Sequence, residues 1–259
     1  MDNKGVVKAI ILAAGEGTRL RPYTLECPKC LVEVEGQSLL DRQLAVLKAG
    51  SIDNITLIGG YLVEMLRRPE VKVRVNPRYA ETNMVWTLFS AEDDLDGDLI
   101  IAYGDIVYSR EILQELLRSK ADIAVAIDLE WESYWRARNE NPLDDAETLK
   151  LGTDGGIIEI GQKPTSIAEI EGQYMGLIKL SARGSQQLKK VFSEAKLLGV
   201  MRGKPLEQAY MTDLLQMMID LHYRVEAVPV RGQWVEVDTV GDLLSSVTQK
   251  RLLQIQSTI

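Results

Sequence analysis

A glycine-rich segment near the start of the chain has the residue types of a phosphate-binding loop. Gly15 and Gly17 follow an apolar run, and glycine lets backbone N–H groups turn toward an anion without obstruction by a Cβ atom. Arg19 can grip phosphate oxygens through paired hydrogen bonds, and Lys29 lies on a proline-stiffened segment shortly after it. Two common nucleotide motifs are excluded, because Leu20 takes the place of the third glycine of a Rossmann fingerprint and no Gly-Lys-Ser/Thr of a Walker A loop occurs.

Cys27 and Cys30, on either side of Lys29, offer a different chemistry. They are the two cysteines of the chain and have the CxxC spacing of a redox pair. A thioredoxin-like pair lies directly after a strand at a helix N-terminus, where the thiol pKa is lowered, whereas this pair lies well beyond the nearest apolar run. A zinc site would need further ligands from a chain whose one histidine is His222. The sequence therefore favours phosphate binding over redox or metal chemistry of the thiols.

The composition narrows the partners of the protein. A chain of 259 residues, 46% of them hydrophobic, can bury a full core, and we expect one large domain. The net charge of −8, without a Lys/Arg-rich tract, argues against nucleic acid and anionic membranes. The first thirty residues instead carry more cationic than anionic side chains, which suits a small anion. No apolar run approaches the ~18 residues of a membrane helix or resembles a full signal peptide, so we expect a cytoplasmic protein.

The elements that must position these residues follow from hydrophobic periodicity. Short apolar runs alternate with segments of helical period, which predicts an α/β fold with three layers and a mostly parallel, mixed sheet. Residues 131–145 mix aromatic and charged residues, and we expect an excursion off the sheet there. The predicted strands cover residues 6–12, 55–58, 71–75, 99–103, 123–127, 157–160, 174–180, 225–230 and 234–238. The predicted helices cover residues 38–49, 83–91, 110–119, 182–196 and 207–221, and a last one begins at residue 240.

The stretch from Ile11 to Lys29 resembles the signature of the nucleotidyltransferases that join a nucleoside triphosphate to a phosphorylated acceptor, such as the sugar-1-phosphate pyrophosphorylases and phosphocholine cytidylyltransferases. The resemblance spans nearly the whole chain in the family's order. It implies a single Rossmann-like (GT-A-type) domain over residues 1–259, and an attack by an acceptor oxygen on the nucleotide α-phosphorus with release of pyrophosphate. The further matching motifs are Gly59-Gly60-Tyr61, Gly104-Asp105, Gln162-Lys163-Pro164 and Trp234-Val-Glu-Val-Asp238.

Two aspartates suit a magnesium ion. Asp105 follows the strand over 99–103, and ligands of open α/β sheets lie at such carboxyl ends. Asp238 can reach the same crevice from a late strand, although it could instead cap the helix that begins at 240. Two carboxylates with waters and substrate phosphates usually hold Mg²⁺. The resemblance implies that Mg²⁺ binds the nucleotide α-phosphate and orients the attacking oxygen.

The resemblance also implies the roles of the glycine-rich segment. Lys29 would neutralise the charge that grows on the transferred group, and Arg19 would hold the β- and γ-phosphates together with the glycine-rich loop. Such positioned charges would supply most of the rate acceleration. The nucleotide-binding residues implied are Leu12, Ala13, Ala14, Gly15, Gly17, Thr18, Arg19 and Gly60.

The acceptor is expected to be a small phosphate or phosphonate. Gln162-Lys163-Pro164 departs from the Glu-Lys-Pro of hexose-1-phosphate enzymes, whereas Asn76-Pro77 and Glu81-Thr-Asn-Met84 look like the small cytidylyltransferases that act on phosphocholine, aminoethylphosphonate or phosphoglutamine. CTP is therefore the expected donor. The candidate acceptor-binding residues are Asn83, Trp86, Lys163 and Tyr174.

An ammonium group on the acceptor would need a cation-binding wall. Trp86, Trp131, Tyr134 and Trp135 could box it by cation–π attraction. The last three have helical spacing, however, and could equally fasten the excursion to the core.

Two other interpretations stay open. The chain could be a hexose-1-phosphate nucleotidyltransferase that uses dTTP, UTP or GTP, or a non-catalytic regulatory module that retains the fold. Retention of Lys29, Asp105 and Asp238 argues against the regulatory interpretation. Any association, for example as a homodimer, would use the surface of the catalytic domain itself.

Overall fold

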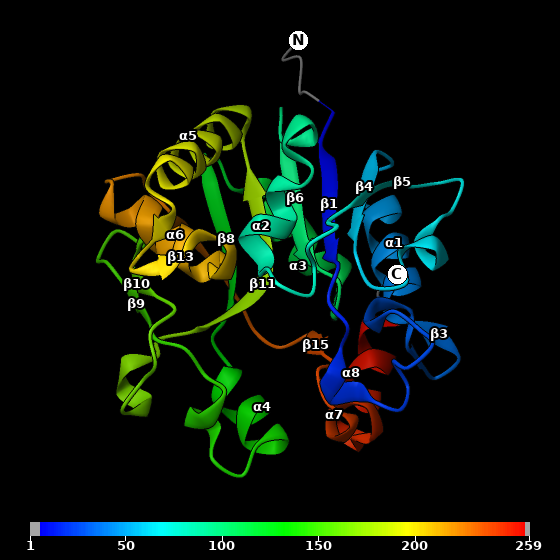
Figure 1. Cartoon of the computed structure of the whole chain (residues 1–259). Coiled ribbons are helices and arrows are strands. Elements are labelled where there is room, and N and C mark those ends of the chain that lie inside the picture. Colours follow the sequence, from blue (N-terminus) through cyan, green and yellow to red (C-terminus); the bar gives the residue numbers. More distant parts are fainter. Residues whose placement is uncertain (1–5, 257–259) are drawn as a thin grey trace.

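A seven-stranded sheet forms the centre of the computed structural model, which describes residues 6–256 (Figure 1). From one edge to the other its strands are β14 (Glu226–Val230), β8 (Ile123–Asp128), β11 (Gln173–Leu180), β6 (Leu99–Tyr103), β1 (Lys8–Ala13), β4 (Ile55–Gly59) and β5 (Lys72–Val75). β11 runs antiparallel to both of its neighbours, and the other neighbouring pairs are parallel. The predicted mostly parallel, mixed sheet is thereby confirmed.

Helices cover both faces of this sheet. One face packs against α1 (Leu39–Ala49) and α3 (Arg110–Arg118), and the other against α2 (Met84–Phe89), α5 (Ala182–Leu198) and α6 (Met211–Asp220). Side chains alternate between the two faces along β1, so that Ile11 joins the first layer of helices and Ile10 the second. Each fully buried aliphatic side chain contributes about 1.5–3 kcal/mol. The three-layer arrangement agrees with the prediction.

Serines fix where several helices begin. The side chains of Ser38, Ser109 and Ser181 precede α1, α3 and α5, and each accepts a hydrogen bond from a backbone N–H in the first turn. Such N-caps stabilise a helix by about 1 kcal/mol each. The helix predicted over 207–221 is shorter than expected, because residues 206–208 form a 3-10 turn and the cap at Tyr210 lets α6 begin only at Met211.

The C-terminal region lies off the central sheet. The predicted strand over 234–238 is β15 (Trp234–Glu236), which pairs antiparallel with the unpredicted β7 (Ile106–Tyr108). The helix predicted from residue 240 is divided at Ser245 into α7 (Val240–Leu244) and α8 (Ser246–Gln256). The remaining paired strands are β2 (Glu33–Val34) with β3 (Gln37–Ser38), β9 (Leu149–Leu151) with β10 (Ile157–Ile160), and β12 (Val200–Met201) with β13 (Lys204–Pro205).

The excursion over 131–145 contains α4 (Trp131–Arg138) and a 3-10 turn at Pro142–Asp144, and it extends below the sheet in Figure 1. Trp131, Tyr134 and Trp135 are buried. The rings of Tyr134 and Trp135 pack on Trp234 with centroids 5.7 and 6.0 Å apart. Of the two alternatives for these rings, packing in the core is confirmed: all three are buried, and Tyr134 and Trp135 fasten α4 to β15.

Within residues 6–256, no helix is long and apolar enough to cross a membrane.

Candidate functional site

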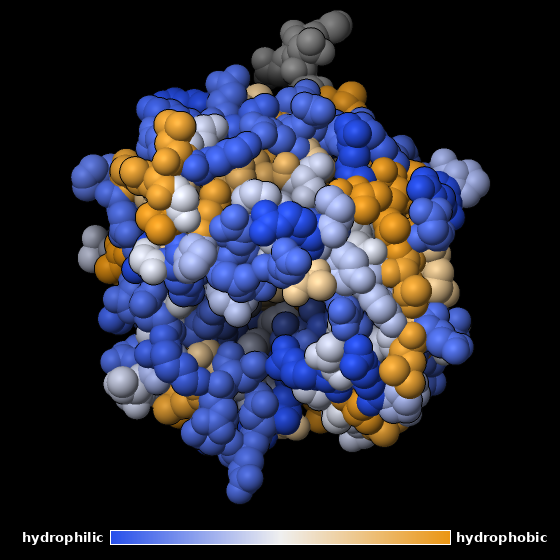
Figure 2. Space-filling view, viewed as in Figure 1, coloured by the Kyte–Doolittle hydropathy of each residue, from blue (hydrophilic) through white to orange (hydrophobic). Residues whose placement is uncertain are grey.

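A cleft of about 340 Å³ opens at the carboxyl ends of β1 and β6. Figure 2 shows this face of the molecule hollowed below its centre, among hydrophilic residues. The cleft brings together most of the site residues expected from the sequence. Those that line it are Leu12, Ala13, Ala14, Gly15, Gly17, Thr18, Arg19, Lys29, Asn83, Asp105 and Asp238.

The parallel pairing of the strands explains this convergence. Leu12 at the end of β1 is in register with Tyr103 at the end of β6, and the Gly104 N–H donates to the Leu12 carbonyl at 2.8 Å. A Cβ on Gly104 would lie 2.8 Å from that same carbonyl oxygen, so only glycine lets the two strand ends approach so closely. Asp105 is thereby held beside the loop that follows β1.

Gly60 lies behind the cleft lining rather than in it. A Cβ there would lie 2.4 Å from Tyr79 Cβ and 2.8 Å from the Ala14 carbonyl oxygen. Tyr79 itself lines the cleft. The missing side chain of Gly60 thus allows Tyr79 to form a wall next to Ala14.

The two loop glycines serve different purposes. Gly17 has a φ of +63°, and a Cβ there would lie 3.0 Å from Lys29 Cβ, so the loop packs directly against the lysine. The Thr24 hydroxyl donates to the Gly17 carbonyl at 2.8 Å and holds this arrangement. Gly15 lines the cleft, and apart from its two neighbours in the chain no atom lies within 4 Å of an added Cβ, so there is open space beside this residue.

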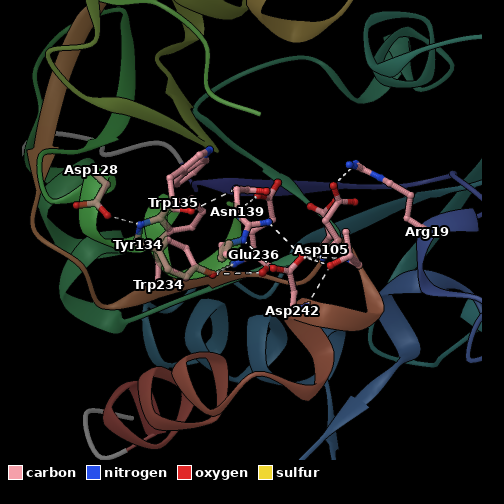
Figure 3. Close-up of polar contacts among 12 residues, drawn as sticks. Arg19, Asp105, Asp128, Tyr134, Trp135, Asn139, Trp234, Glu236 and Asp242 are labelled. Atoms are coloured by element: carbon pink, nitrogen blue, oxygen red, sulfur yellow. Dashed lines mark hydrogen bonds and ion pairs between the residues drawn. The ribbon is translucent and has the colours of Figure 1, made fainter. Parts of the chain in front are cut away.

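Lys29 lies between the two predicted metal ligands. Its Nζ donates to Asp105 Oδ2 at 2.6 Å and to Asp238 Oδ1 at 2.5 Å. Burial alone would lower the pKa of Lys29, but the carboxylates of Asp105 and Asp238 raise it above its ordinary value. Arg19, whose side chain is 61% exposed, forms a further ion pair with Asp238 (Figure 3).

The aspartate pair fits a divalent cation. Both carboxylates converge on the same nitrogen atom, and Asp105 Oδ1 is buried without a hydrogen-bond partner among the described residues. Buried polar atoms are normally satisfied, so an orphaned carboxylate oxygen suits a ligand. Within residues 6–256 there is no cluster of three or more side chains with metal-binding geometry. Mg²⁺ would therefore take two protein ligands and complete its shell with water and phosphate oxygens.

Glu236 is a third carboxylate in the cleft that we did not single out from the sequence. Burial raises the pKa of its carboxyl to about 7, although the Arg138 guanidinium, 2.7 Å away, lowers it. The alternation of β15 could have indicated it, since residues 236 and 238 share one side of an extended segment. Nothing in the sequence pointed to Arg138.

The four candidate acceptor-binding residues differ in whether they line the cleft. Asn83 lines the cleft, but among the described residues Trp86, Lys163 and Tyr174 do not. Arg78 stacks 5.0 Å from the Trp86 ring centroid, and the Lys163 ammonium donates to the Leu143 and Asp144 carbonyls at 2.5 and 2.6 Å. Tyr174 packs edge-on against Tyr103, which does line the cleft, at a centroid distance of 5.7 Å. Acceptor binding by these residues stays a prediction.

The cysteines lack the features of a redox pair. Both thiols are free, and Cys30 is buried in the cleft lining. Burial raises the pKa of Cys30 to about 12 and also raises the pKa of Cys27. Thiols react as thiolates, so the raised pKa values keep both side chains in the less reactive thiol form at neutral pH.

Known proteins resemble this chain over most of its length. Residues 9–169 match the family described as MobA-like NTP transferase domain. The chain is 40% identical to a CTP:phosphoglutamine cytidylyltransferase of Campylobacter jejuni, over 92% of this chain and 98% of that protein. It is 36% identical to a choline-phosphate cytidylyltransferase of Streptococcus pneumoniae, over 44% of this chain and 51% of that protein.

Solved structures share the fold. The inositol-1-phosphate CTP transferase from T. maritima superimposes with a TM-score of 0.77 and 20% identity, and the match covers 99% of both chains. Together with the central sheet, this likeness confirms the predicted Rossmann-like α/β fold.

Proposed function

Because the chain belongs to the MobA-like NTP transferase family and is thus a nucleotidyltransferase, we propose that it transfers CMP from CTP to a small phosphorylated or phosphonate acceptor and releases pyrophosphate. The names of its relatives support CTP as the donor. The observation that carries the proposal is the contact of Lys29 with both Asp105 and Asp238 at the end of the cleft.

The reaction needs positioned charge more than covalent chemistry. An acceptor oxygen attacks the α-phosphorus of CTP, a new P–O bond forms, and the bond to the β-phosphate oxygen breaks with release of pyrophosphate. Asp105 and Asp238 would hold Mg²⁺, which supplies Lewis-acid stabilisation of phosphate charge when bound. The Lys29 ammonium, fixed beside these carboxylates, stabilises the negative charge that develops on the transferred group.

The triphosphate side of the cleft is provided by the loop after β1. The open backbone of Gly15 and the following residues Gly17 and Thr18 would donate N–H groups to the β- and γ-phosphates. Arg19 is largely exposed and can turn from Asp238 to these phosphates. Leu12, Ala13 and Ala14 would border the nucleoside, with Gly60 behind them.

The acceptor would bind beside Asn83 and Tyr103, with Tyr174 behind them. The Asp105 carboxylate lines the same cleft as the Tyr103 ring, so negative charge lies close to this wall. Aromatic rings with a nearby carboxylate attract an ammonium group. An amino-containing acceptor would therefore suit this side of the cleft.

A panel of substrates tests the proposal. CTP, UTP, dTTP and GTP are each combined with phosphoglutamine, phosphocholine, aminoethylphosphonate and hexose 1-phosphates, and pyrophosphate release is measured with Mg²⁺ present. We expect turnover with CTP and a small amino-containing acceptor, and loss of turnover in Asp105→Asn and Asp238→Asn. Turnover with hexose 1-phosphates alone would overturn the assignment. Nucleotide binding without turnover would favour the regulatory interpretation.

Two free thiols are typical of a reducing compartment, and we infer a cytoplasmic enzyme. Association as a homodimer also stays a prediction.

A further inference from the structure

Arg138 is a buried cation behind the cleft, at the end of α4. Its side chain is only 4% exposed. Its Nε and Nη2 donate to the two carboxylate oxygens of Asp242 at 2.8 and 3.3 Å, and its Nη1 donates to Glu236 Oε2 at 2.7 Å. The planar guanidinium suits this fork of two carboxylates, which an ammonium group could not match.

Asp242 links Arg138 by hydrogen bonds to Asp238, a predicted metal ligand. Its Oδ2 accepts hydrogen bonds from the backbone N–H groups of Asp238 at 3.1 Å and of Thr239 at 2.9 Å. The Thr239 hydroxyl in turn accepts from the Asp242 backbone and caps α7. The backbone that carries the Asp238 side chain is therefore held by a carboxylate whose own orientation depends on Arg138.

Glu236 connects Arg138 to the same site by a second route. Glu236 lines the cleft and lies two residues before Asp238 on β15, whose pairing with β7 places it close to Asp105. Figure 3 shows Glu236 and Asp242 lying between Trp135 and Asp105. Because Arg138 Nη1 donates to Glu236 Oε2, Arg138 also fixes this third acidic side chain of the cleft.

The aromatic layer of the excursion holds Arg138 in place. The guanidinium lies 5.1 Å from the ring centroids of both Tyr134 and Trp135. The Tyr134 hydroxyl also accepts a hydrogen bond from the Glu236 N–H at 3.0 Å. Rings on one side and carboxylates on the other leave the guanidinium little freedom.

We propose that Arg138 is a positioning residue for nucleotidyl transfer, because it fixes Asp242 and Glu236 and through them sets the orientation of Asp238 toward the metal. The inference rests on the proposed function, and it gives α4 a role beyond the packing of its aromatic residues. Partners that orient a metal ligand in this way typically change metal affinity or activity by about 10- to 100-fold when they are replaced.

Metal binding tests the proposal apart from catalysis. Mn²⁺ binding is measured by electron paramagnetic resonance in the presence of a non-hydrolysable CTP analogue, for the wild type, Arg138→Met, Arg138→Lys and Asp242→Asn. We expect Arg138→Met to weaken Mn²⁺ binding and lower kcat, each by about 10- to 100-fold, while the acceptor KM changes less than about 2-fold. Arg138→Lys should be intermediate, because it keeps the charge but loses the fork.

The matched control is Arg136→Met on the same helix. Arg136 is exposed and pairs with Glu132 one turn away, so its removal should leave Mn²⁺ binding and kcat unchanged. Combining Arg138→Met with Asp242→Asn should cost less than the sum of the two single changes, because both variants lose the route through Asp242.

The outcomes separate the two proposals. If folded Arg138→Met binds Mn²⁺ as tightly as the wild type, the positioning role is wrong. If Arg138→Met does not fold, unaltered Mn²⁺ binding in both Arg138→Lys and Asp242→Asn overturns it. If the wild type binds Mn²⁺ with the analogue but transfers CMP to no acceptor, the proposed function fails while the comparison of variants still decides the role of Arg138.

Discussion

Lys29 donates a hydrogen bond to Asp105 at 2.6 Å, although 76 positions separate the two residues in the chain. The loop after β1 supplies the lysine and the end of β6 supplies the aspartate, and parallel pairing of these strands brings the two together. The carboxylates of Asp105 and Asp238 outweigh the effect of burial and raise the pKa of Lys29. The lysine therefore stays charged across the whole neutral pH range.

Replacing Lys29 by Met should lower kcat by roughly 10²-fold or more, because one preorganised charge that stabilises the transition state is lost. Steady-state pyrophosphate release measures the effect, and calorimetric titration with CTP separates it from nucleotide binding. Lys72→Met is the matched control, since Lys72 lies on the edge strand β5, is half-exposed and pairs with Asp94. Equal kcat values for Lys29→Met and this control would contradict the assigned role of Lys29.

Gly15→Ala should weaken CTP binding with little change in stability, whereas Gly60→Ala should lower the stability of the fold. An added Cβ at Gly15 meets no described atom within 4 Å, so stability should change by less than about 0.5 kcal/mol while CTP binding weakens. At Gly60 the Cβ would clash with Tyr79 and Ala14, and we expect a loss of about 1–3 kcal/mol in the free energy of unfolding.

Urea unfolding and CTP titration of both glycine variants give the two quantities. A stable Gly60→Ala would show that Tyr79 can move away at low cost. Tight CTP binding by Gly15→Ala would show that the Gly15 backbone does not bind the phosphates.

Glu147 should make the protein less stable at high pH. Burial, reinforced by Asp213, raises the pKa of Glu147 from 4.5 to about 7 in the folded protein, although Lys204 and Thr212 lower it. The folded state then holds a proton that the unfolded state has released, so the free energy of unfolding falls as pH rises from about 4.5 to about 7. Above about pH 7 the whole decrease in the free energy of unfolding has occurred, and below about pH 4.5 there is none.

Glu147→Gln should abolish this loss. The change that the substitution causes in the free energy of unfolding should therefore be more favourable at pH 8 than at pH 4.5 by roughly 1–2 kcal/mol, after allowance for partial exposure. Urea unfolding at both pH values measures the difference. Glu115→Gln is the control, because Glu115 is an exposed carboxylate that pairs with Arg118. Parallel stability profiles for wild type and Glu147→Gln would show that Glu147 titrates normally.

Activity should not depend on the redox state of the thiols. Burial raises the pKa of both Cys27 and Cys30, so neither is a thiolate at neutral pH. We expect equal kcat values with and without a reductant, and near wild-type activity in Cys27→Ser. A large reversible loss of activity on mild oxidation would restore the redox interpretation of this pair.

Local sequence was sufficient for the elements that carry the phosphate loop. β1 and the strand over 99–103 could be predicted directly, because buried strands are continuous apolar runs, and the helical period predicted α1 over nearly its observed length. β7 escaped prediction, because a three-residue strand acquires its pairing only from β15, far along the chain.

The sequence by itself determined the α/β class, the glycine-rich loop and the identity of Lys29, Asp105 and Asp238 as candidate site residues, because each depends on short-range pattern or on a continuous motif. Tertiary structure alone decided that Lys29 contacts both aspartates, that Trp131 and its neighbours lie in the core, that Glu236 lines the cleft, and that Arg138 lies behind it. These outcomes depend on burial and on charges brought together from distant segments, and neither quantity exists until the chain has folded.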